Sequence, residues 1–85
     1  MHESGLIRQL MQTALDAAAE HNSALRGIHL RLGVLASGSA QHLREHFEQE
    51  IQRRALPSIE LSIVEDSEFL GGIEIESIEL AEESQ

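Results

Sequence analysis

The sequence predicts an α/β (α+β) domain: a two-layer sandwich with two helices on one face of a three-stranded mixed sheet. Two segments repeat apolar residues every three or four positions, as amphipathic helices do, and three shorter segments alternate apolar and polar residues, as half-buried strands do. Their order is helix, strand, helix, strand, strand. Because each strand has one apolar face, both helices should cover the same side of the sheet.

The first helix is expected from about Ser4 to about His21, with apolar residues recurring from Leu6 to Ala18. Ser4 suits the N-cap position, and Asn22 suits a left-handed stop. The helix should therefore end just before the first strand.

The first strand is expected at residues 28–32, where apolar residues alternate with His29 and Arg31 before Gly33 ends the run. A loop then leads to the second helix, with Ser37 or Ser39 as its cap. The buried stripe of that helix is predicted to contain Ala40, Leu43, Phe47 and Ile51.

The second helix should stop near Arg54, because Pro57 disfavours helical geometry at the residue before it. Strands are expected at 59–63 and from residue 73 to about 80. Their alternation slips after Ile75, and a bulge near Ser77 would return the apolar side chains to one face. We expect these two strands to pair as an antiparallel hairpin. The outer sheet face should present His29, Arg31, Glu60, Glu74 and Glu76.

Composition limits the possible functions of the single domain expected over residues 1–85. The net charge of −9 argues against nucleic acid and against an anionic membrane surface as partners. It fits a metal cation or a basic partner, or it simply keeps the protein soluble. The outer sheet face and the acidic loop 65–68 are likewise either a partner surface or a solvated face. With no signal-peptide pattern and no long apolar run, the expected location is the cytoplasm.

Catalytic signatures are missing from the sequence. There is no cysteine, so disulfides, thiolate zinc sites and cysteine catalysis are excluded. There is also no Gly-rich phosphate loop, no Ser-His-Asp signature and no HExxH motif. We therefore do not expect an enzyme.

Several local motifs and the element order resemble the HypA/HybF family of hydrogenase nickel-incorporation metallochaperones. The matching segments are Met1-His2-Glu3 at the start, the 32–37 segment after the first strand, Phe47-Glu48 in the second helix, the strand at 59–63 and the closing strand at 72–79. The family inserts a zinc domain with two Cys-x-x-Cys pairs between the last two strands. Here the zinc-binding insert is absent and the flanking strands are joined by a short loop.

The resemblance implies a nickel-binding core domain that serves the maturation of a nickel metalloenzyme, most simply a [NiFe]-hydrogenase. It implies Ni(II) held at Met1, His2 and Glu3, no zinc, and transfer to a hydrogenase large subunit or a nickel-handling GTPase. The alternative is a non-metal protein-interaction module derived from the same core after loss of the zinc domain.

The chemistry of the first three residues supports a metal site independently. The α-amine of Met1, the backbone amide nitrogen of His2 and its imidazole Nδ1 can bind one ion through adjacent chelate rings. The amide or carboxylate of Glu3, or another group, could complete the plane. Such nitrogen-rich, square-planar geometry favours Ni(II) or Cu(II). The ordinary alternative is an incidental histidine near a chain end.

A second, weaker candidate is the pair His42 and His46, which lie four residues apart on the second helix with Glu50 one turn further. This spacing can place two imidazoles on one ion. The ordinary interpretation is a polar helix flank. His21 should lie near the end of the first helix, and His29 should be exposed or contact a glutamate across the sheet, so neither is assigned a ligand role.

Overall fold

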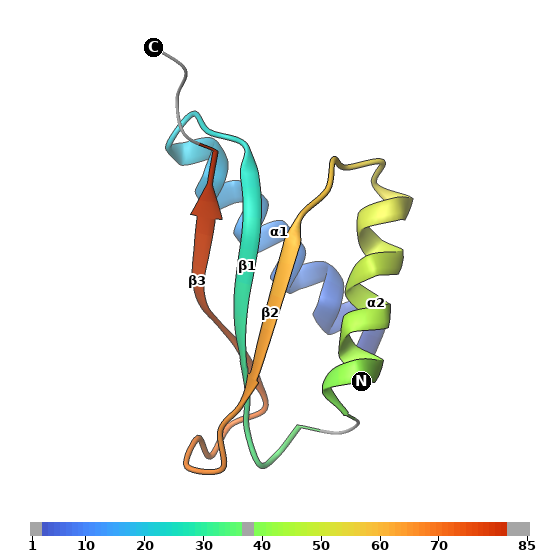
Figure 1. Cartoon of the computed structure of the whole chain (residues 1–85), viewed down its shortest axis with the longest axis vertical. Helices are drawn as coiled ribbons and strands as arrows, with labels where there is room; N and C mark the ends of the chain where they lie inside the picture. The colour runs from blue at the N-terminus through green and yellow to red at the C-terminus, as the bar shows by residue number, and fades with distance from the viewer. Residues whose placement is uncertain (1–2, 37–38, 82–85) are drawn as a thin grey trace.

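The computed structural model describes residues 3–36 and 39–81, with side chains described from Gly5 onward. The elements follow the predicted order: α1 (Glu3–Glu20), β1 (Leu25–Leu32), α2 (Ala40–Arg53), β2 (Glu60–Glu65) and β3 (Ile73–Leu80). Figure 1 shows α1 crossing behind the sheet and α2 standing beyond β2. The helices pack on the sheet with α1 against β1 and β3 and α2 against β2. The predicted α+β sandwich is confirmed.

The ends of the helices follow local chemistry closely. Asn22 adopts the left-handed conformation with φ of 53° and ends α1, as predicted. The hydroxyl of Ser39 caps α2 by accepting a hydrogen bond from the His42 amide at 3.2 Å. The expected N-cap at Ser4 was wrong: α1 begins at Glu3, so Ser4 lies within its first turn.

α2 ends at Arg53, close to the predicted stop, and its last turn is closed by a left-handed residue. Ala55 has φ of 55°, and the amide of Leu56 donates to the carbonyl of Ile51 at 3.1 Å. This is the hydrogen-bond pattern usually completed by glycine. The chain turns here before Pro57 and enters β2.

The sheet order β2-β1-β3 corrects one expectation, since β2 and β3 do not form a hairpin. β1 lies between them, parallel to β2 and antiparallel to β3. α2 is the crossover of a β-α-β unit, which places β2 parallel to β1. The chain then crosses the end of β1, where Gly33 donates to the Gly72 carbonyl and Val34 to that of Phe69, and β3 takes the opposite edge.

The predicted bulge in the last strand is confirmed. His29 lies opposite Ser77 while Leu30 lies opposite Ile75, which leaves Glu76 as the extra residue of β3. The shift puts the apolar side chains on the face that the helices cover, in the pairs Leu25–Leu80, Ile28–Ile78, Leu30–Ile75 and Leu32–Ile73.

The core lies between β1 and the two helices. Phe47 of α2 is fully buried and contacts a layer of aliphatic side chains that includes Ile7, Met11, Ile28 and Leu30. Neither helix in the described part of the chain is long and apolar enough to cross a bilayer.

Candidate metal centre

The first turns of α1 lie against the middle of α2. Ile7 and Arg8 of α1 line a shallow hollow of about 150 Å³ together with His46 and Glu50 of α2. In Figure 1 the start of α1 passes behind α2. The chain therefore enters the fold beside the helix that carries the histidine pair.

Met1 and His2 of the predicted nickel site lie outside the described residues, and so does the side chain of Glu3. The backbone of Glu3 is already helical, so α1 begins at the third residue of the predicted site. The first four amides of a helix have no intrahelical acceptor. The Glu3 amide is therefore not committed to the hydrogen bonding of α1.

The structure brings the imidazoles of His42 and His46 together. Their Nε2 atoms are 3.1 Å apart, the ring centroids are 4.6 Å apart and the ring planes meet at 81°. Both side chains lie beside the buried stripe of α2, whose members Leu43 and Phe47 pack into the core. His42 is exposed and His46 is half-buried, so the pair faces solvent from a fixed helix.

Glu50 does not join the histidines as the spacing allowed. It is only 7% exposed and accepts hydrogen bonds from Arg53 at 2.6 and 3.2 Å and from Arg54 at 2.6 Å. The bond from Arg53 is the largest cause that lowers the pKa of Glu50 to about 2, burial opposes it, and Arg54 adds to it. The carboxylate is held by two guanidinium groups and is not a metal ligand here.

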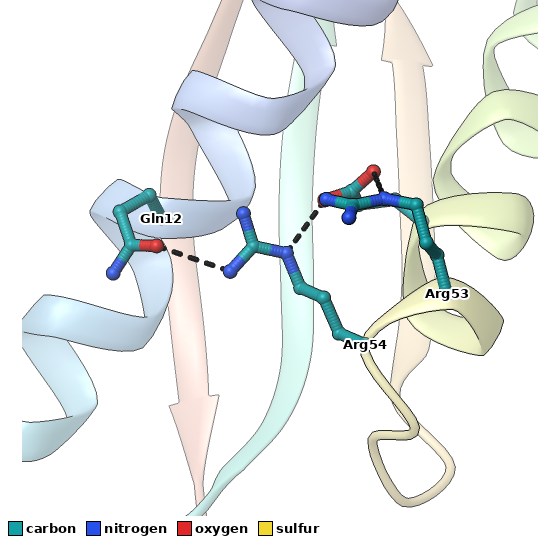
Figure 2. Close-up of polar contacts among 4 residues, drawn as sticks. Gln12, Arg53 and Arg54 are labelled. Atoms are coloured by element: carbon teal, nitrogen blue, oxygen red, sulfur yellow. Dashed lines mark hydrogen bonds and ion pairs between the residues drawn. The ribbon is translucent and has the colours of Figure 1, made fainter.

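Figure 2 shows how this cluster joins the helices: Arg54 extends from α2 toward α1 and donates to the Gln12 side chain at 3.0 Å. We call Gln12, Glu50, Arg53 and Arg54 the arginine cluster. Sequence analysis did not identify Glu50 as the anchor of these two arginines. The signal was present as a glutamate followed by arginines three and four residues later, the spacings that meet on one helix face.

No group of three potential His, Asp, Glu or Cys ligands gathers within the described part of the chain. The histidine pair thus supplies two ligands of a site, not a complete coordination sphere.

The outer sheet face carries cross-strand ion pairs. His29 Nε2 lies 2.8 Å from Glu79 Oε2, which confirms the expected contact with a glutamate. Arg31 pairs with Glu74 and, at 3.4 Å, with Asp66, and its guanidinium carbon lies 4.4 Å from the centre of the Phe69 ring. The hydrogen bond to Glu74 is the main cause that raises the pKa of Arg31. Asp66, Glu74, Glu76 and Glu79 outnumber Arg31 and His29 here, so this face keeps a net negative charge.

No protein-family model matches the chain, and no curated protein matches it either. The functional conclusion therefore depends on the motifs of the sequence and on the geometry described above.

Proposed function

We propose that this protein is a nickel metallochaperone for the maturation of a nickel metalloenzyme, most simply a [NiFe]-hydrogenase, and acts in the cytoplasm. It would hold Ni(II) at Met1, His2 and Glu3 and pass it to a hydrogenase large subunit or a nickel-handling GTPase. One observation carries the proposal: a Met-His-Glu segment leads directly into the first helix of a fold whose element order resembles the HypA family.

The donor set explains the choice of metal. The Met1 amine, the His2 amide and the His2 Nδ1 form adjacent chelate rings, and Ni(II) accepts such square-planar nitrogen coordination. The Glu3 amide precedes the hydrogen-bonded part of α1, so its use as a fourth donor would break no helical hydrogen bond. The Glu3 carboxylate is the other candidate for that position.

Two electrostatic effects oppose each other at this site. The partial positive charge at the start of α1 disfavours a bare cation. Deprotonated amide donors and the net charge of −9 favour it. Binding that requires amide deprotonation weakens as pH falls. Such a site suits a carrier that must release its metal to a client.

Calorimetry with Ni(II) tests the proposal, using untagged protein with a free Met1 amine. The controls are the same protein with one extra N-terminal residue and the His2→Ala variant. We expect one nickel bound by the native protein and at least a tenfold weaker affinity in both controls, since each removes a chelate ring. Equal binding by all three proteins, or no binding by any, would refute the nickel site at the triplet.

The second candidate function is a non-metal interaction module, which one observation favours. Val34, Leu35 and Leu70 are 53%, 75% and 75% exposed, and they lie at the end of the sheet where the segments after β1 and before β3 meet. Exposed apolar side chains in a group are typical of a docking surface. Partner capture that persists in His2→Ala without nickel, but fails in Leu35→Ser with Leu70→Ser, would favour this function.

A further inference from the structure

We infer that His42 and His46 form a second metal-binding element, which holds one borderline divalent transition-metal ion between their two Nε2 atoms. This element goes beyond the nickel site proposed at the triplet, because it uses side chains of α2 and needs neither the Met1 amine nor His2.

The separation of the donor atoms fits a shared ion. Metal–imidazole bonds of about 2.0–2.1 Å place two donors about 2.9 Å apart at a right angle and about 3.4 Å apart at a tetrahedral angle. The observed Nε2 distance of 3.1 Å lies between these values. A metal could therefore be bound with only small side-chain adjustments.

The helix that carries the pair is well fixed at both ends. Ser39 caps its start through the His42 amide, and Leu43 and Phe47 hold its buried face in the core. The arginine cluster joins its last turn to α1. Because the donors are presented by a rigid element, little ordering entropy is lost when an ion binds.

Binding requires a tautomer change in one ring. When two neutral imidazoles make an Nε2 to Nε2 hydrogen bond, one nitrogen carries the proton and the other accepts it. An ion needs the lone pairs of both Nε2 atoms, so the proton of the donor ring leaves Nε2 and a proton is taken up at Nδ1, with water as the carrier. Both rings stay neutral, and no net proton is released.

The charges around the pair are mixed. Arg8 and Arg53 line the same hollow as His46, and Arg53 shares the single carboxylate of Glu50 with Arg54. The whole chain carries a charge of −9. With two imidazole donors and water in the remaining positions, the order of affinities should be Cu(II) above Ni(II) and Zn(II), with Mg(II) and Ca(II) far weaker.

The test uses the full chain with His2→Ala, so that the triplet no longer competes. Cu(II) is added and the histidine Cε1–H signals are followed by NMR, in which a paramagnetic ion broadens nearby protons. We expect broadening of His42 and His46 at low copper, before His21 and His29 respond. Simultaneous broadening of all histidines would show adventitious binding and overturn the inference.

Matched variants show whether copper binding depends on the positions of His42 and His46 or only on the number of histidines. In the His2→Ala background, His42→Ala and His46→Ala should each weaken copper affinity at least about tenfold, since loss of even an outer-shell partner costs that much. The exchange Gln41→His with His42→Gln keeps the histidine count but moves the pair to a spacing of five, which separates the rings on the helix. It should also bind at least tenfold more weakly, while His21→Ala should bind as the parent does.

Circular dichroism checks that each variant is folded. The midpoint of thermal unfolding gives a second measurement of metal binding. An ion that binds only the folded helix raises this midpoint in the parent and not in the variants. Equal copper affinity in the parent, in His46→Ala and in the exchanged variant would overturn the inference. The outcome is independent of nickel binding at the triplet, because the parent lacks His2.

Discussion

The two halves of α2 carry side-chain groups at the same helical spacing, but the two groups have different roles. In the first half, His42 and His46 are four residues apart and their imidazoles meet near the surface. In the second half, Glu50 and the C-cap residue Arg54 are also four apart, but the carboxylate is buried and bonded to two guanidinium groups. Spacing therefore brings side chains together, while burial and charge balance decide whether the group stabilises the fold or offers donor atoms.

Phe47 lies between the two halves and holds both against the core. We expect Phe47→Ala to reduce the free energy of unfolding by about 3–5 kcal/mol, because it removes the only buried aromatic ring of the described core and leaves a cavity. Urea denaturation followed by circular dichroism measures the loss. The exposed Gln52→Ala is the matched control on the same helix and should change the free energy by less than about 0.5 kcal/mol. Equal effects of the two variants would contradict the assigned core.

Glu50→Gln removes the negative charge of the arginine cluster and keeps a side chain of nearly the same volume. We expect a loss of about 2 kcal/mol at neutral pH, because the buried carboxylate accepts three hydrogen bonds from the arginines. The estimate is reduced for solvent screening, since Arg53 is 55% exposed. Glu48→Gln, on the exposed side of α2, is the control. A loss below about 0.5 kcal/mol in Glu50→Gln would show that the cluster does not stabilise the fold.

The contribution of Glu50 to stability should depend on pH. The pKa of Glu50 is lowered from 4.5 to about 2 in the folded protein, so its contribution to stability is present above pH 4.5. That contribution is lost as pH falls from 4.5 toward 2, because the unfolded chain takes up a proton at Glu50 in this range while the folded carboxylate stays ionised. The difference in unfolding free energy between the native protein and Glu50→Gln should therefore shrink across this range. A difference that stays constant from pH 6 to pH 3 would contradict the lowered pKa.

The smallest expected effect concerns the turn after α2. Ala55 adopts φ of 55°, a conformation that glycine reaches without a steric cost. We expect Ala55→Gly to increase the free energy of unfolding by about 0.5–1 kcal/mol. Glycine relieves the backbone strain of the left-handed conformation, and its greater conformational entropy in the unfolded chain offsets part of this gain. Ala19→Gly, in the exposed last turn of α1, should instead destabilise by up to about 1 kcal/mol. If both variants destabilise equally, the left-handed turn is not a source of strain.

Local features of this fold were predictable because local chemistry determines them. Asn22 and Ser39 end and begin helices through their own backbone and side chain, and the parity slip after Ile75 required a bulge. The strand order was not predictable in the same way. Alternation shows which face of a strand is apolar, but it does not show which strand becomes central, and the expected hairpin was wrong for that reason.

The candidate sites show the same difference between local spacing and packing between elements. The spacing of His42 and His46 predicted that their rings meet, and the structure places the Nε2 atoms in contact. The role of Glu50 was missed, because its burial depends on how α2 packs against α1 and on Arg54 reaching Gln12. Nickel binding at Met1, His2 and Glu3 stays a prediction.

Nickel titration of the native protein, compared with protein that carries one extra N-terminal residue, is the direct test of nickel binding at Met1, His2 and Glu3. The extension leaves every side chain in place and removes only the chelate formed by the Met1 amine. We expect one Ni(II) to bind the native chain and the extended chain to bind it at least about tenfold more weakly. Equal affinity of the two proteins would contradict this expectation and would direct attention to the docking surface around Leu35 and Leu70.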